Sequence, residues 1–63
     1  MVYRKITEEQ YDELKTLKDP EPKAFELGIL NFGDQLRGIR KIGVVTKEDG
    51  HYLGLEFFGK GID

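Results

Sequence analysis

Apolar residues near the N-terminus recur at helical spacing within the polar segment TEEQYDELKTLK, and this pattern predicts a helix over residues 7–18. Tyr11 and Leu14 begin a narrow apolar stripe, as expected for a helix that packs along one edge. Thr7 and Gln10 have the spacing of a capping box, in which each side chain binds the other residue's backbone N–H. Acidic residues in the first turn and lysines in the last turn complement the helix dipole.

Alternating residues near the C-terminus predict a β-hairpin with strands at about 39–47 and 51–58. The Asp49-Gly50 dipeptide suits the positive φ angles of a type I′ turn between them. The pairs predicted by this turn are Glu48 with His51, Thr46 with Leu53, Val44 with Leu55 and Ile42 with Phe57.

This register divides the hairpin into two faces of different character, because side chains alternate along a strand. The face predicted to join the core comprises Ile42, Val44, Thr46, Leu53, Leu55 and Phe57. The opposite face comprises Lys41, Gly43, Val45, Lys47, Tyr52, Gly54, Glu56 and Phe58.

The middle of the chain has two interpretations. A helix over about 20–37 is favoured, with Asp19 as its cap, both prolines in its first turn, and an end near Gly33 or Gly38. Its apolar stripe would contain Phe25, Ile29, Phe32, Leu36 and Ile39. The alternative is a strand over 24–32, which would be buried on both faces because its apolar residues do not alternate.

These patterns predict one small α+β domain over residues 1–63, with VYRKI at 2–6 as an additional short strand. A chain of 63 residues builds only a small core, and without cysteine no disulfide stabilises it, so self-association is a plausible aid to stability. The N-terminus is charged where a signal peptide needs an apolar run, and no segment approaches the length of a membrane span. We therefore predict a cytoplasmic location.

The residue types needed for catalysis are scarce. The chain has no serine or cysteine, and its one histidine, His51, is interpreted as an exposed residue beside the hairpin turn. Glu48, Asp49 and His51 are close in sequence, but an exposed hairpin tip is a poor enclosure for a metal ion. The glycines at five-residue intervals from Gly28 match no phosphate-binding loop. We predict that the protein is not an enzyme and binds no metal or cofactor.

The sequence favours a protein that binds another protein or itself through the exposed hairpin face. The glycines in this face flatten the strand pair and allow another backbone or ring to approach. The predicted helix also places two leucines opposite its apolar stripe. The predicted partner-binding residues are Val45, Tyr52, Phe58, Leu27 and Leu30.

The alternative function is a nucleic-acid-binding regulator that uses the basic 37–47 segment. The cations that would contact phosphate are Arg37, Arg40, Lys41 and Lys47. The net charge of −2 weighs against broad affinity for nucleic acid.

Overall fold

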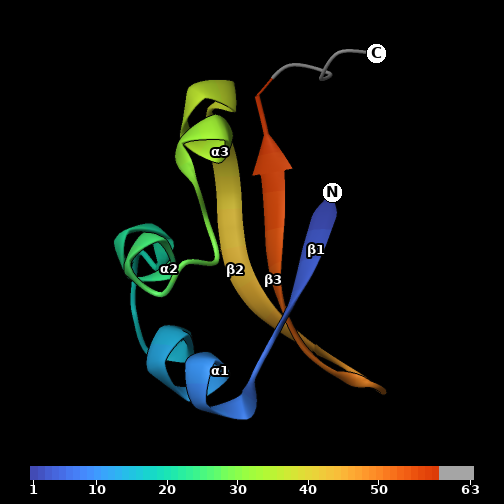
Figure 1. The fold of residues 1–63 in the computed structure, drawn as a ribbon. Coiled ribbons are helices and arrows are strands. Elements are labelled where there is room, and N and C mark those ends of the chain that lie inside the picture. The colour runs from blue at the N-terminus through green and yellow to red at the C-terminus, as the bar shows by residue number, and fades with distance from the viewer. Residues whose placement is uncertain (59–63) are drawn as a thin grey trace.

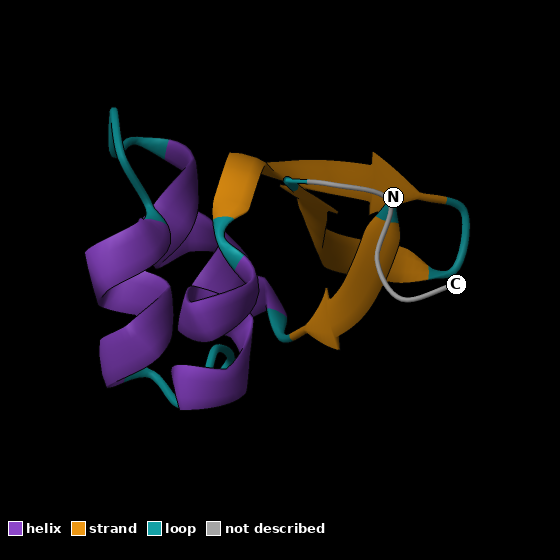
Figure 2. Ribbon diagram, turned by 90° about the horizontal axis from the view of Figure 1, so that it is seen from above, coloured by secondary structure: helices purple, strands orange, loops and turns teal. Residues whose placement is uncertain are grey.

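The computed structural model describes residues 1–58, in which an antiparallel sheet of strand order β1-β3-β2 packs against helices (Figure 1). The elements in chain order are β1 (Val2–Ile6), α1 (Glu8–Lys15), α2 (Glu21–Glu26), α3 (Phe32–Arg37), β2 (Ile39–Lys47) and β3 (Gly50–Phe57). Seen from above, the helices form one layer and the strands the other (Figure 2). The α+β fold and the N-terminal strand are as predicted.

The capping box of α1 is confirmed. The Thr7 hydroxyl accepts the Gln10 backbone N–H at 3.0 Å, and the Gln10 side-chain oxygen accepts the Thr7 N–H at 2.9 Å. Leu14 is buried and directs the helix onto the sheet. The helix ends at Lys15, before the predicted limit of residue 18.

The single helix predicted over 20–37 is wrong, because two short helices occupy this segment. The chain leaves α2 at Gly28, whose φ of 82° is unfavourable for a residue with a side chain. Asn31 then starts α3 by accepting the Asp34 N–H at 3.0 Å through its side chain. At the start of α2, the Asp19 carboxylate accepts the Glu21 N–H at 3.2 Å, although the cap position itself is one residue later. The alternative strand over 24–32 is not formed.

The break between α2 and α3 changes which residues face the core. Leu30 was predicted to lie on an exposed side of the helix, but it is 3% exposed and belongs to the core. Phe32 and Leu36 were predicted to be buried, but they are 76% and 88% exposed. The helical spacing that placed these residues on opposite sides does not apply across the non-helical turn.

The hairpin forms, but with a register shifted by two residues. Val44 pairs with Leu53 and Ile42 with Leu55, rather than with the residues two positions farther along β3. Glu48 and Asp49 form the loop, and Gly50, with a φ of 143°, begins β3. Asp49 does not adopt the positive φ that a type I′ turn requires. An even shift leaves every side chain on its predicted face.

The core lies between the helices and the inner face of the sheet. β3 is central and supplies Leu53 and Leu55, both fully buried. The buried hydrophobic residues are Ile6, Leu14, Ala24, Leu30, Leu53 and Leu55. The fold therefore depends on a small set of aliphatic contacts, as predicted from the chain length.

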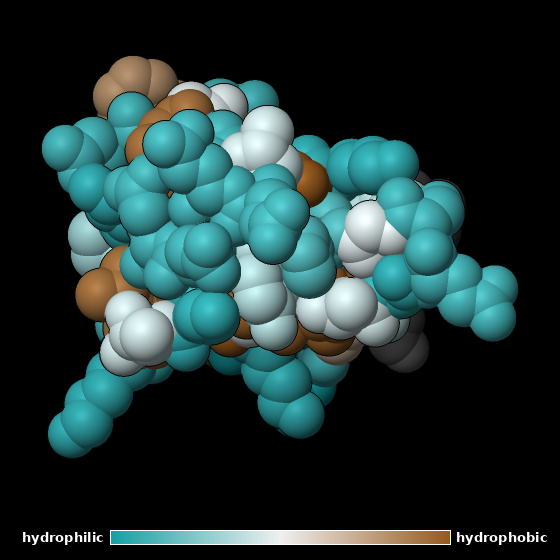
Figure 3. Space-filling model, turned by 90° about the horizontal axis from the view of Figure 1, so that it is seen from below, coloured by the Kyte–Doolittle hydropathy of each residue, from teal (hydrophilic) through white to brown (hydrophobic). Residues whose placement is uncertain are grey.

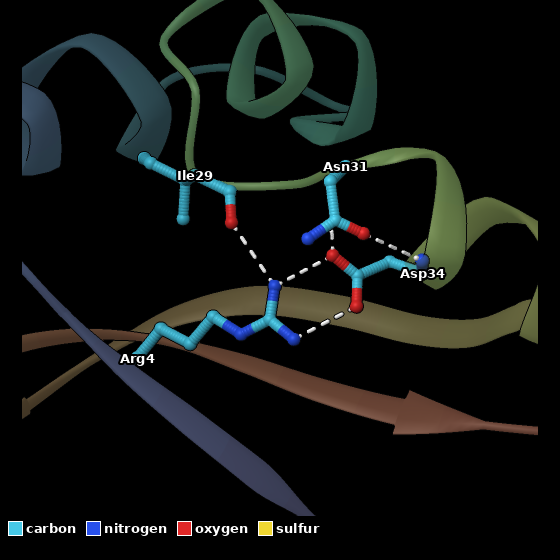
Figure 4. Close-up of polar contacts among 4 residues, drawn as sticks. All are labelled: Arg4, Ile29, Asn31 and Asp34. Atoms are coloured by element: carbon cyan, nitrogen blue, oxygen red, sulfur yellow. Dashed lines mark hydrogen bonds and ion pairs between the residues drawn. The ribbon is translucent and has the colours of Figure 1, made fainter.

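An ion pair between the half-buried Arg4 and the buried Asp34 connects β1 to α3 (Figure 4). The Arg4 guanidinium donates to both carboxylate oxygens of Asp34, at 2.7 and 2.8 Å, and to the Ile29 carbonyl at 3.0 Å. Asp34 also accepts the Asn31 N–H at 2.9 Å. Hydrogen bonding to Arg4 is the main reason that the pKa of Asp34 lies below its ordinary value. Both carboxylate oxygens of Asp34 are thus bonded within the chain, and the pair positions α3 against β1.

Candidate functional site

The helices pack on one face of the sheet, and no helix of residues 1–58 covers the other, which we call the outer face (Figures 1 and 2). Strand pairing places one row of side chains from each strand on it. We define the outer-face patch as Tyr3, Lys5, Lys41, Gly43, Val45, Lys47, Tyr52, Gly54 and Glu56. The sequence predicted the hairpin residues of this face but not the two from β1.

Two tyrosines and a lysine form the ordered centre of the patch. The rings of Tyr3 and Tyr52 meet edge to face, with centroids 6.4 Å apart. The Lys47 ammonium lies 3.8 Å from the Tyr3 ring centroid and 5.2 Å from that of Tyr52. The Tyr52 hydroxyl donates to Asp49 at 2.7 Å, which raises the pKa of Tyr52 and lowers that of Asp49. These contacts hold the two tyrosine side chains in place.

The two glycines opposite each other in the hairpin have different surroundings. A Cβ atom placed at Gly54 would lie 3.3 Å from Cε1 of Tyr3 and 3.6 Å from Sδ of Met1, so the chain's own side chains fill that space. A Cβ atom placed at Gly43 would meet nothing within 4 Å. The flat strip predicted from the sequence is therefore open only at Gly43, beside the half-buried Val45.

The structure brings together some of the predicted partner-binding residues and separates others. Val45 and Tyr52 are paired on the outer face. Phe58 is 61% exposed at the end of β3, where its ring lies against Gly38. Leu27 is half-buried against the core, and Leu30 is within the core. Burial thus removes Leu30 from any surface that a partner could contact.

The predicted nucleic-acid contacts do not form a single basic cluster. The Arg37 guanidinium stacks on the Phe57 ring, with Cζ 4.0 Å from the centroid. Arg40 forms an exposed ion pair with Glu56 at 3.0 Å. Lys41 is exposed on the outer face, and Lys47 lies over Tyr3 near the other end of β2. Three of the four cations therefore already have partners within the chain.

His51 is a packing residue rather than the exposed turn residue predicted from the sequence. Its ring stacks on Tyr11 of α1, with centroids 4.0 Å apart and planes 13° apart. Its Nδ1 atom lies 3.0 Å from the Thr46 hydroxyl. His51 lies within β3 on the same face of the sheet as Leu53, and α1 packs on this face. Across residues 1–58, no cluster of three or more metal-ligating side chains is found.

The end of the molecule where α1 and the hairpin loop lie is mainly hydrophilic (Figure 3). Apolar side chains show there only as small separate areas. None of the helices in the described part of the chain has the length and apolar character of a membrane span. In comparisons with known proteins, no family model matches this chain, and no curated sequence or solved structure resembles it significantly.

Proposed function

We propose that this protein is a non-enzymatic binding module that docks another protein on the outer-face patch. The observation that carries this proposal is an uncovered sheet face on which two ordered tyrosines lie near an open position at Gly43. A side chain of the partner enters the space above Gly43, and the tyrosines contact the surface around it. Such a module acts by covering a site on its partner or by holding it in place.

The ordering of the tyrosines favours their use as anchors. Tyrosine is common at interface hot spots because its ring supplies a large contact area with few rotatable bonds. Tyr52 is held by Asp49 and packs against Tyr3, so little side-chain freedom remains to be lost on binding. The sheet beneath them provides a rigid support.

Protein is favoured over nucleic acid as the partner for two reasons. The Lys47 ammonium lies over the Tyr3 ring, where a stacked base would have to bind. Glu56, and Asp49 beside the tyrosines, also place negative charge at this surface and reduce its attraction for phosphate.

Site-specific photocrosslinking tests the proposal in the cells that produce the protein. A benzophenone amino acid at Val45 is expected to form an adduct with a defined protein, whereas one at the exposed Glu9 of α1 is not. Gly43→Leu fills the open position and should abolish the Val45 adduct without unfolding the chain, because the site is unobstructed and its φ is not positive.

Mass spectrometry of the crosslinked material identifies the partner class. A nucleic-acid adduct at Val45 that survives nuclease-free purification would support the alternative function. No adduct at Val45, or one equally strong at Glu9 and unaffected by Gly43→Leu, would contradict the proposal.

A further inference from the structure

Helix α3 presents its apolar side chains to solvent. The buried residue of α3 is Asp34, which is bonded to Arg4 and Asn31, whereas Phe32 and Leu36 are 76% and 88% exposed. On a helix the direction midway between these two residues is about 180° from Asp34. They therefore form a ridge on the side of α3 opposite Asp34, and we call it the α3 ridge.

The ridge continues onto the neighbouring helix. The Phe32 ring meets Phe25 of α2 edge to face, with centroids 5.8 Å apart, and Phe25 itself packs against the core. This contact supports Phe32 while leaving most of its surface exposed. The ridge is thus an apolar surface on a supported base.

The charge distribution around the ridge suits contact with an identical surface. Between Asn31 and Leu36 the exposed residues are all uncharged, and Asp34 is buried against Arg4. The exposed Arg37, which follows Leu36, stacks on the Phe57 ring. A second copy therefore meets no like charge there, whereas two outer-face patches would bring lysines such as Lys41 and Lys47 together. Self-association is disfavoured at the sheet and permitted at α3.

The small core gives a reason for self-association. Six hydrophobic residues are buried within the described chain, and no cysteine is available for a disulfide. Association of two chains is one of the usual ways in which domains of this size gain apolar burial. Stable interfaces bury about 800 Å² per partner. An aromatic side chain supplies only about 150–250 Å² of this area, so the ridge forms the centre of a small interface.

We infer that the α3 ridge is the contact between two copies of this chain in a weak symmetric dimer. The two α3 helices lie antiparallel across a twofold axis, so that Phe32 of each copy packs on Leu36 of the other. The inference is independent of the proposed function, because the outer-face patch remains free in this dimer.

Analytical ultracentrifugation from about 10 µM to about 1 mM tests the inference, since small interfaces dissociate within this range. The weight-average mass is expected to rise from 7.3 kDa toward twice that value. Leu36→Glu should weaken the dimer at least about tenfold, because it places charge at the contact centre. Leu17→Glu, a matched change at a residue 41% exposed outside α3, should leave dimerisation unchanged.

A mixture of two variants tests the antiparallel arrangement. Phe32→Lys and Leu36→Glu each weaken the homodimer, but together they form a heterodimer in which opposite charges meet once and the native contact is kept once. A monomeric mass over the whole range, or a dimer insensitive to Leu36→Glu, would overturn the inference. Leu36→Glu leaves the Val45 crosslink intact, so the outcomes for dimer and partner are distinguishable.

Discussion

Asp34 is the buried residue of α3, and its contacts determine both its ionisation and the position of the helix. Its carboxylate receives two hydrogen bonds from Arg4 and one from the Asn31 backbone. These bonds favour the charged form, and they lower the pKa of Asp34 despite its burial. The unfolded chain, in which the carboxyl has its ordinary pKa of 3.8, therefore binds a proton more readily than the folded chain.

Asp34→Asn should lower the free energy of unfolding by about 2–3 kcal/mol at pH 7, because the Arg4 charge loses its partner. The ion pair's contribution is fully present above the ordinary carboxyl pKa and is lost as the pH falls through the lower pKa of the folded state. The difference between wild type and variant should consequently shrink in acid. Urea unfolding followed by circular dichroism at several pH values measures it.

The exposed Arg40–Glu56 pair provides the control. Glu56→Gln removes a surface ion pair and should change stability by less than about 1 kcal/mol. Equal losses in the two variants, or a difference for Asp34→Asn that grows as the pH falls, would contradict this account of Asp34.

At the level of the elements, the features predicted correctly from sequence are those fixed by nearby residues. The capping box at Thr7 depends on contacts within one turn, and so does the helix end at Gly38, one of the two positions, Gly33 or Gly38, at which the sequence predicted a helix end. The sequence did not predict the break after α2, because the apolar residues on either side of it have the spacing of one continuous helix. Gly28 followed by Asn31 and Asp34, a second capping box, was the available signal.

Gly28→Ala tests whether the break depends on backbone conformation. Its φ of 82° is strained for alanine, and the variant should lose about 1–2 kcal/mol of stability even though the site has open space. Gly43→Ala is the matched control, because that site is also open but has no positive φ, and it should gain about 0.5 kcal/mol. The midpoints of urea unfolding compare the two variants. Equal changes in stability would contradict the explanation that the backbone conformation of Gly28 causes the break.

At the scale of the whole molecule, the candidate site depends on contacts between distant parts of the sequence. Tyr3 reaches the outer face because β1 pairs with β3, placing Tyr3 beside Gly54. Alternation within the hairpin indicated Val45 and Tyr52, but no local pattern showed which strand would lie next to them. The same is true of Arg4, whose partner Asp34 lies thirty residues farther along the chain.

Stability should be distributed unevenly over the molecule, as native-state hydrogen exchange can measure. The amides of Leu53 and Leu55, in the strand paired on both sides, should exchange only through global unfolding. Those of α3 should exchange through local opening at lower free energy, because this helix buries only Asp34. The prediction fails if α3 amides are protected as strongly as those of β3.

The strand order also constrains when the protein folds. The central strand β3 follows both of its neighbours in the chain, so β1 and β2 have no partner in the sheet until β3 has been synthesised. A nascent chain that has emerged only as far as β2 lacks Leu53 and Leu55, the centre of the core. Pairing between distant segments also slows folding. Translation of β3, rather than of any helix, is therefore the step at which this protein first becomes able to fold.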